Sequence, residues 1–294
     1  MDTARSDAKI LPGGESRFGG QEMDFLTPFS RYPRLICMET SSRSETSPLR
    51  LVFLGSDAVA LPLLNALAEA SVCRVVAVFT QPDREVGRGQ KVQANAIKVW
   101  ALAKGLPVFQ PEKLTEAVRI QLAVQEADVG LVMAYGHILR DEFIVTPRHG
   151  MLNLHTSLLP KYRGASPIQS AVANGERVSG VTLMRIVRQL DAGPIAAAES
   201  VSIEPLDTAA DVEAKLAVAC VPLVVRALPK LADGSLHFTP QEDGNATYCR
   251  KLRKEDGALD FRAAASTLAA RINGLFPWPS CTAAIGGQSV RICL

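Results

Sequence analysis

The chain has 294 residues, of which 47% are hydrophobic and 21% are charged, and its formal net charge is +2. Such a chain can bury a sizeable core, with room for one large domain plus a smaller unit. No apolar stretch reaches the roughly 20 residues that cross a bilayer, and the N-terminus lacks a basic region followed by an apolar signal core. We therefore expect neither secretion nor a membrane partner. The small net charge neither requires nor excludes a nucleic-acid partner.

Residues 1–48 are rich in Ser, Gly, Arg and acidic residues and show no sustained periodicity. A segment of this composition cannot bury enough apolar surface to order itself, so we predict a disordered N-terminal extension. A mitochondrial transit peptide is the alternative, which the acidic residues disfavour.

Strands and helices alternate from residue 51 onward. Apolar runs that end in turns predict strands, and apolar residues at helical spacing predict the helices between them. The predicted strands are 51–54, 75–79, 129–134, 151–155, 181–186 and 195–201, and the predicted helices are 61–68, 94–104 and 211–230. A long polar loop follows residue 79, and Asp211 is expected to cap the last helix. This alternation indicates an α/β fold, a Rossmann-like open and mostly parallel sheet with both faces covered.

The pattern changes after Gly234. Residues 235–253 are polar and without strong periodicity, so we predict a linker between a catalytic domain at 49–234 and a second unit at 254–294. In the second unit we expect a helix at 263–273 and two short strands at 281–285 and 289–294. About 40 residues are too few for an independent core.

The six cysteines are scattered singly, without the paired C-x-x-C spacing of zinc ribbons or redox dithiols. We expect reduced thiols and no metal site. This usage fits the bacterial cytosol, with an organelle matrix as the alternative. We also expect a monomer.

The chemistry-bearing residues are Asn153, His155 and Asp191. The first two share one face of the predicted strand 151–155 by its two-residue period, at the end where ligands bind in open α/β sheets. An amide that stabilises an oxyanion, an imidazole that accepts a proton and a carboxylate that orients the imidazole are what acyl transfer to an amine requires. The alternative is structural: a strand-end histidine and two turn residues. A dehydrogenase is disfavoured, because only Gly55 of a G-x-G-x-x-G motif is present.

The segment Asn153-Leu154-His155-Thr156-Ser157-Leu158-Leu159-Pro160, with Gly164, Pro167 and the later Leu190-Asp191-Ala192-Gly193, resembles the folate-dependent formyltransferases. The resemblance implies the formyltransferase fold, 10-formyltetrahydrofolate as the formyl donor without a metal, and catalysis by Asn153, His155 and Asp191. It also implies a set of folate-binding residues, namely Ser157, Leu158, Leu159, Pro160, Tyr135, Gly136, Ile138 and Leu139. Ordinary core packing is the alternative for the apolar members of that set. His137, beside them, is expected to be a packing or edge residue.

The polar loop at 79–91 carries Arg84, Arg88 and Lys91 between glycines and can place cations against phosphates. It resembles the insertion of methionyl-tRNA formyltransferases that contacts initiator tRNA, which implies that methionyl initiator tRNA is the partner. A solvated surface loop is the alternative. The same resemblance implies a C-terminal β-barrel of OB-like type, which we expect to be incomplete here. Donor chemistry would then be intact and tRNA affinity weakened.

The expected activity is therefore formyl transfer from 10-formyltetrahydrofolate to the α-amino group of methionyl-tRNA, for translation initiation. Three alternatives stay open at this stage. They are transfer to a small amine such as a nucleotide amino sugar, folate binding by a catalytically impaired truncated form, and hydrolysis of the formyl donor.

Overall fold

The computed structural model describes residues 47–86 and 89–292. The predicted disordered extension at 1–48 lies outside these residues, apart from its last two positions. Within the described ranges, no helix combines the length and the apolar character needed to span a membrane.

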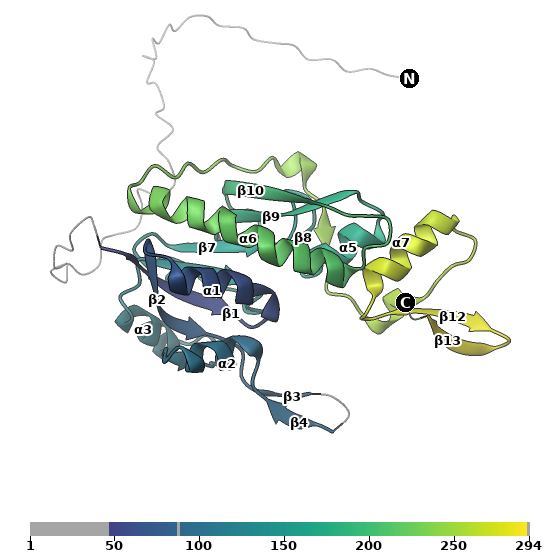
Figure 1. Cartoon of the computed structure of the whole chain (residues 1–294), viewed down its shortest axis with the longest axis horizontal. Coiled ribbons are helices and arrows are strands. Elements are labelled where there is room, and N and C mark those ends of the chain that lie inside the picture. Colours follow the sequence, from purple (N-terminus) through teal and green to yellow (C-terminus); the bar gives the residue numbers. More distant parts are fainter. Residues whose placement is uncertain (1–46, 87–88, 293–294) are drawn as a thin grey trace, which may run out of the picture. The chain divides into compact units, whose positions relative to one another are not determined.

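A seven-stranded sheet forms the centre of the fold (Figure 1), with the strand order β10-β9-β7-β6-β1-β2-β5. Five neighbouring strands are parallel, and β9 is antiparallel to both β7 and β10. The expectation of a Rossmann-like, mostly parallel sheet is confirmed. The strands are β1 Leu49–Gly55, β2 Cys73–Phe79, β5 Val108–Phe109, β6 Val129–Met133, β7 Met151–His155, β9 Val178–Arg185 and β10 Ile195–Ser202.

The first described strand, β1, lies inside the sheet; β2 and β5 follow on one side of it, and β6 and β7 lie on its other side. The strand order therefore reverses between β1 and β6. In doubly wound sheets, ligands bind beyond the carboxyl ends of the strands near such a reversal. The end of β7 is one strand away from it.

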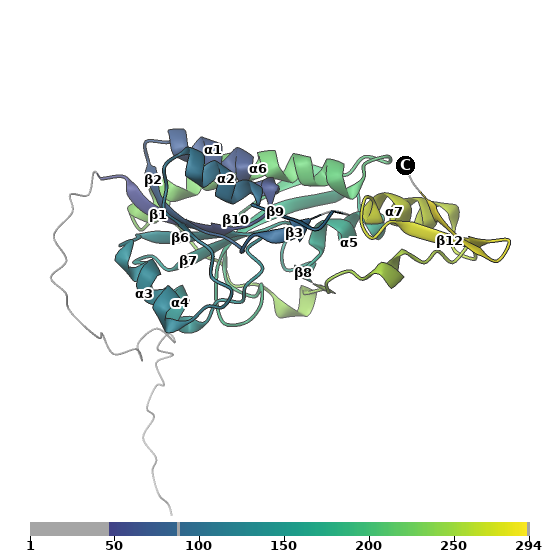
Figure 2. The same ribbon diagram turned by 90° about the horizontal axis from the view of Figure 1, so that it is seen from below.

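Helices cover both faces of the sheet (Figure 2). One face carries α1 Leu61–Glu69, preceded by the short helix η2 Ala58–Ala60, together with α2 Ala96–Ala103 and α6 Ala209–Ala232, and the other carries α3 Glu116–Val124 and α4 Asp141–Ile144. Strand β1 shows the alternation that this arrangement requires. Phe53 belongs to the core under α1 and α6, whereas Val52 and Leu54 belong to the core under α3 and α4.

The prediction that Asp211 caps the long helix was wrong in position. Thr208 is the N-cap residue, and its hydroxyl accepts from the backbone N–H of Asp211 at 3.2 Å. The Asp211 carboxylate accepts from the Thr208 backbone N–H at 2.9 Å in return. This reciprocal capping box leaves Asp211 in the first turn, where its charge also complements the helix dipole.

The predicted polar loop after β2 contains a hairpin, β3 Arg84–Val86 and β4 Lys91–Gln93. The predicted linker contains η3 Asp243–Asn245 and β11 Tyr248–Cys249, and β11 pairs in parallel with β8 Arg163–Gly164. The remaining elements are α5 Pro167–Ala173, η4 Lys254–Gly257, α7 Ala265–Leu275, β12 Cys281–Ile285 and β13 Gln288–Ile292. The last two form an antiparallel hairpin where two strands were expected.

Helix α7 packs closely on α5. A Cβ atom added to Gly274 of α7 would lie 2.3 Å from the backbone nitrogen of Ala173, so only a glycine permits this approach. Leu275, Cys281 and Ala173 form a small core there. This small core therefore joins the C-terminal segment to helix α5 through Ala173.

Candidate functional site

Asn153 and His155 lie at the carboxyl end of β7 and share one face of the sheet. Leu152 and Leu154, which alternate with them, are buried in the core under α1 and α6. Asn153 and His155 therefore face the side that carries α3 and α4. The two-residue period of the strand placed them together as the sequence predicted.

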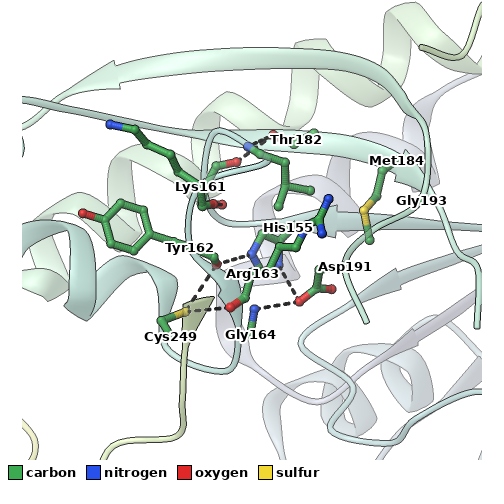
Figure 3. Close-up of polar contacts among 12 residues, drawn as sticks. His155, Lys161, Tyr162, Arg163, Gly164, Thr182, Met184, Asp191, Gly193 and Cys249 are labelled. Atoms are coloured by element: carbon green, nitrogen blue, oxygen red, sulfur yellow. Dashed lines mark hydrogen bonds and ion pairs between the residues drawn. The ribbon is translucent and has the colours of Figure 1, made fainter. Parts of the chain in front are cut away.

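The imidazole of His155 is held between two oxygen atoms from different loops (Figure 3). Its Nε2 lies 2.9 Å from the carbonyl oxygen of Tyr162, to which it donates, and its Nδ1 lies 3.7 Å from Oδ2 of Asp191. The His155 side chain is 7% exposed and the Asp191 side chain 11% exposed, so water screens this pair weakly. With Nε2 carrying the proton, Nδ1 of the neutral ring is free to accept one.

Asp191 reaches His155 through a loop that folds back over the sheet. In the pairing of β9 with β7, Arg185 lies opposite Leu152, so the chain leaves β9 near the start of β7, away from His155. The loop 186–194 then returns to bring Asp191 beside His155. Oδ2 of Asp191 accepts from the backbone N–H of Gly164 at 2.8 Å, and the residue has a positive φ of 51°.

Asn153 lines a pocket of about 110 Å³. Within the described residues, no hydrogen bond engages the side-chain amide of Asn153, so it is available to a ligand. Two exposed apolar side chains, Ile138 at 79% and Leu190 at 61%, stand at the pocket's wall. The lining residues are Val132, His137, Ile138, Leu139, Asn153, Met184, Ile186, Val187, Arg188, Gln189, Leu190 and Asp191. We call this the Asn153 pocket.

The structure divides the eight predicted folate-binding residues among three environments. Ile138 and Leu139 line the Asn153 pocket, but Leu158 and Pro160 line a second pocket of about 470 Å³ with Lys161, Tyr162, Ala171, Glu176, Val178, Ser179 and Asn245. Tyr135, Ser157 and Leu159 are buried in the third, and Gly136, with a positive φ of 79°, is exposed outside all three. Folate binding by these residues stays a prediction.

Ser157 and Leu159 shape the loop that holds His155. The Ser157 hydroxyl donates to the carbonyl of Lys161 at 2.6 Å, and the Ser157 carbonyl accepts from the hydroxyl of Thr182 at 2.7 Å. The same Thr182 oxygen accepts from the backbone N–H of Leu159 at 3.1 Å. These bonds fix the turn that presents the Tyr162 carbonyl to the imidazole.

His137 was expected to be a packing or edge residue, and the structure places it in the wall of the Asn153 pocket. Its ring stands edge-on to Tyr135, with the ring centroids 5.0 Å apart. Nε2 of His137 and the hydroxyl of Tyr135 are buried without a hydrogen-bond partner in the described part of the chain. Burial raises the pKa of Tyr135, so its hydroxyl stays protonated.

The predicted tRNA-contacting residues belong to the β3–β4 hairpin. Arg84 and Lys91 are exposed at its two strands, and Arg84 pairs with Glu112 at 2.8 Å. Both side chains of that pair are more than half exposed, so a phosphate could replace the carboxylate at little cost. Arg88 lies outside the described residues. Contact of all three with tRNA stays a prediction.

Three residues next to the His155–Asp191 pair were not identified from the sequence. Gln241 donates to the backbone carbonyls of the Asp191 loop, Arg163 is a buried cation beside it, and the Cys249 thiol lies 3.3 Å from the Tyr162 carbonyl. Burial raises the pKa of the Cys249 thiol, which therefore stays protonated as a donor. Gln241 and Cys249 come from the segment without periodicity, and nothing in their local sequence indicates these contacts.

The arrangement supports acyl transfer to an amine. Asn153 can donate to an oxyanion, and His155 can accept a proton at Nδ1 and become an imidazolium next to the Asp191 carboxylate. Across the residues that the structure describes, no group of three or more His, Cys, Asp or Glu side chains could hold a metal ion.

The sequence matches the family described as formyl transferase over residues 49–228 and the C-terminal domain of formyl transferases over residues 251–293. Methionyl-tRNA formyltransferase from Pseudomonas putida is 42% identical over 245 residues, which cover 83% of this chain and 79% of the relative. The enzyme of that name from Acidobacterium capsulatum is 43% identical over 246 residues, with coverages of 83% and 79%. The one from Thermotoga neapolitana is 39% identical over 245 residues, with coverages of 83% and 78%.

Solved structures with a similar fold include WlaRD, a sugar 3N-formyl transferase with dTDP and 5-N-formyl-THF. Its TM-score is 0.63 at 18% identity, covering 82% of this chain and 84% of that one. HypX from Aquifex aeolicus in complex with tetrahydrofolic acid has a TM-score of 0.58 at 17% identity, covering 83% of this chain and 37% of that one. At these identities the likeness concerns the fold alone.

Proposed function

Because the chain belongs to the formyl transferase family, we propose that it transfers the formyl group of 10-formyltetrahydrofolate to the α-amino group of methionyl initiator tRNA. The observation that carries the chemistry is the buried His155–Asp191 pair beside Asn153, whose amide has no hydrogen-bond partner among the residues that the structure describes. The choice of methionyl-tRNA as the acceptor is based on the relatives at about 40% identity. The product would serve translation initiation, in the bacterial cytosol or an organelle matrix.

The donor fits the Asn153 pocket in part. A volume of about 110 Å³ is well below the roughly 300 Å³ or more of a pocket that encloses a drug-sized ligand, so only a ring system of the donor would be enclosed. The exposed Ile138 and Leu190 side chains offer apolar surface to the part that stays outside. Asn153 then stands where the formyl oxygen would lie, and we keep Ile138 and Leu139 as the folate contacts of this pocket.

The reaction begins when the neutral amine of the acceptor attacks the formyl carbon. As the carbon–nitrogen bond forms, the Asn153 amide N–H donates to the developing oxyanion. Nδ1 of His155 accepts the proton that the amine loses, and the imidazolium is held between the Asp191 carboxylate and the Tyr162 carbonyl. Collapse of the intermediate breaks the bond from carbon to N10, and His155 returns the proton to that nitrogen as tetrahydrofolate leaves. All four of these groups belong to one chain, so a monomer suffices.

The β3–β4 hairpin supports a tRNA acceptor rather than a small amine. Its Lys91 is exposed, and its Arg84 makes an exposed ion pair with Glu112, so both are available to phosphates. We keep Arg88, in the same hairpin by sequence, as a third contact. We also propose the boundaries 49–234 for the catalytic domain, 235–253 for the connecting segment and 254–294 for the C-terminal unit.

The test is a formyl-transfer assay with labelled 10-formyltetrahydrofolate and four parallel acceptor conditions. These are methionyl initiator tRNA, uncharged tRNA, a nucleotide amino sugar, and no acceptor. Formyl-methionyl-tRNA as the main product is expected. A formylated sugar without formyl-methionyl-tRNA would move the assignment to small amines, and formate released at equal rate without acceptor would indicate a hydrolase.

A further inference from the structure

The segment after α6 contacts both loops that carry the catalytic pair. We call residues 235–253 the connector. Its Thr239 exchanges two backbone hydrogen bonds of 2.8 Å with Ile195, at the end of the Asp191 loop. Farther along, the Thr247 carbonyl accepts from the backbone N–H of Arg163 at 2.8 Å, and the Thr247 hydroxyl accepts from that of Tyr162 at 2.8 Å. The connector thus joins the His155 loop to the Asp191 loop.

Gln241 of the connector uses both ends of its amide at this junction. Its Nε2 donates to the carbonyl of Asp191 at 2.9 Å and to the carbonyl of Gly193 at 2.7 Å. Its Oε1 accepts from Nε and Nη2 of Arg163 at 3.1 and 2.8 Å. The donor and acceptor ends of the amide are therefore assigned by their partners, since a guanidinium only donates and a carbonyl only accepts.

Arg163 keeps the amide in this orientation. It is 3% exposed, and its guanidinium also donates to Asp243 at 2.8 Å and to the hydroxyl of Tyr248 at 3.4 Å. A buried guanidinium requires acceptors around its fork, so rotation of the Gln241 amide would leave an N–H group facing a cation. The next residue, Gly164, donates its backbone N–H to the Asp191 carboxylate at 2.8 Å.

The Asp191 loop needs this external support. Asp191 has a φ of +51°, which is unfavourable for a residue with a Cβ and persists only where the surroundings determine it. Gly193 is pressed against the end of β9, where an added Cβ would lie 1.8 Å from the carbonyl oxygen of Arg185. The Asp191 carbonyl that Gln241 binds is two bonds from the Cα that carries the catalytic carboxylate.

We propose that Gln241 is a positioning residue that keeps the Asp191 carboxylate beside the imidazole of His155, and that the connector thereby sets the geometry of the catalytic pair. The inference rests on the proposed function and adds a residue to it. Cys249 acts at the other end of the connector, because its thiol lies 3.3 Å from the same Tyr162 carbonyl that accepts from Nε2 of His155 at 2.9 Å. Gln241 does not line the Asn153 pocket, and it binds the backbone carbonyl of Asp191 rather than its carboxylate.

The principal test is a double-mutant cycle between Gln241→Met and Asp191→Asn. Gln241→Met keeps the volume of the side chain and removes the four hydrogen bonds that join it to Asp191, Gly193 and Arg163. We expect kcat to fall about 10- to 30-fold with the KM for the formyl donor changed less than about 3-fold. In the Asp191→Asn background, the same substitution should cost less than about 3-fold, because the carboxylate that Gln241 positions is already gone. Equal losses in both backgrounds would overturn the proposal.

Two further variants guard against a folding defect. Gln241→Glu keeps the acceptors that Arg163 needs but removes the donors to Asp191 and Gly193, and we expect a kcat loss similar to that of Gln241→Met. Glu242→Gln is the matched control, since Glu242 is exposed on the same segment and accepts only from nearby Asn245. A loss of kcat in the control as large as in Gln241→Glu would contradict the assignment.

Nuclear magnetic resonance of the histidine rings supplies a readout that needs no acceptor. The chain has four histidines, so the ring nitrogens of His155 can be assigned by comparison with a His155→Asn sample. Their chemical shifts report the hydrogen bonds and the tautomer of the ring. We expect them to move in Gln241→Met and to stay in Glu242→Gln. Unmoved shifts in Gln241→Met would refute the inference even if formyl transfer is confirmed, and moved shifts would support it even if the acceptor proves different.

Discussion

Asp191→Asn removes the charge beside His155 and leaves the shape of the site almost unchanged. The asparagine oxygen can still accept from the N–H of Gly164, which Asp191 binds at 2.8 Å. At the 3.7 Å that separates Nδ1 of His155 from Oδ2 of Asp191, an effective dielectric constant of about 20 gives an attraction of about 4 kcal/mol between imidazolium and carboxylate. This attraction exists only after the imidazole has taken the proton, so it stabilises the transition state selectively.

The corresponding loss in kcat is about 10³-fold as an upper value, and about 10²-fold if the asparagine dipole compensates in part. The assay is single-turnover formyl transfer to methionyl-tRNA, with binding of the formyl donor measured separately by fluorescence titration. Donor binding should stay within about 3-fold, because Asp191 contributes one group among many to the pocket wall. Asp260→Asn, which neutralises an exposed carboxylate paired with Arg262, serves as the control. Turnover of Asp191→Asn within about 3-fold of the parent would refute the role of the pair.

Three other outcomes follow from the structure. Gly164→Ala should lower the melting temperature by about 5 °C, because Gly164 has a φ of +126° and an added Cβ would lie 2.0 Å from the carbonyl oxygen of Cys249 in β11. Gly244→Ala is the control and should change the melting temperature by about 1 °C, since no atom lies within 4 Å of its added Cβ. Burial raises the pKa of the Cys220 thiol from 9.0 to about 12, so iodoacetamide at pH 9 should label this thiol in urea but not in the native protein. The stability that the buried neutral thiol contributes is present below pH 9 and is lost as the pH rises toward 12. Labelling of the native protein at the rate seen in urea would contradict this. Lys91→Ala should weaken tRNA binding about 3-fold at low salt and reduce the slope of log affinity against log salt concentration by about 1. Lys230→Ala, on α6, is the control and should change neither the affinity nor the slope. Equal effects of the two substitutions would show that the hairpin does not belong to the tRNA site.

The sequence was sufficient where a short-range rule decided the outcome. The two-residue period of 151–155 placed Asn153 and His155 on one face, and alternating apolar runs predicted the parallel strands around them. It was insufficient where the partner lies far along the chain. Gln241 contacts a residue 50 positions away, and a connector without periodicity gave no indication of it.

The predicted folate-binding set illustrates a second limit. Leu158 and Leu159 are adjacent in the chain, yet one lines the second pocket and the other is buried with 9% exposure. Spacing alone does not tell which side of an irregular loop a residue faces, because a loop has no fixed period. The helix cap shows the same limit on a smaller scale. Both Thr208 and Asp211 are good capping residues, and only the backbone geometry decides that Thr208 begins α6.

The length of the loop 186–194 determines where Asp191 lies relative to His155. Because β9 ends near the start of β7, nine residues must cover the return path that brings Asp191 to His155. Removal or insertion of one residue shifts the chain by up to about 3.8 Å. That shift is close to the 3.7 Å between Nδ1 of His155 and Oδ2 of Asp191. Changes of sequence in this loop can therefore be tolerated where changes of length cannot, and a formyl transferase redesigned for a different acceptor would have to keep these nine residues in number while it varies their side chains.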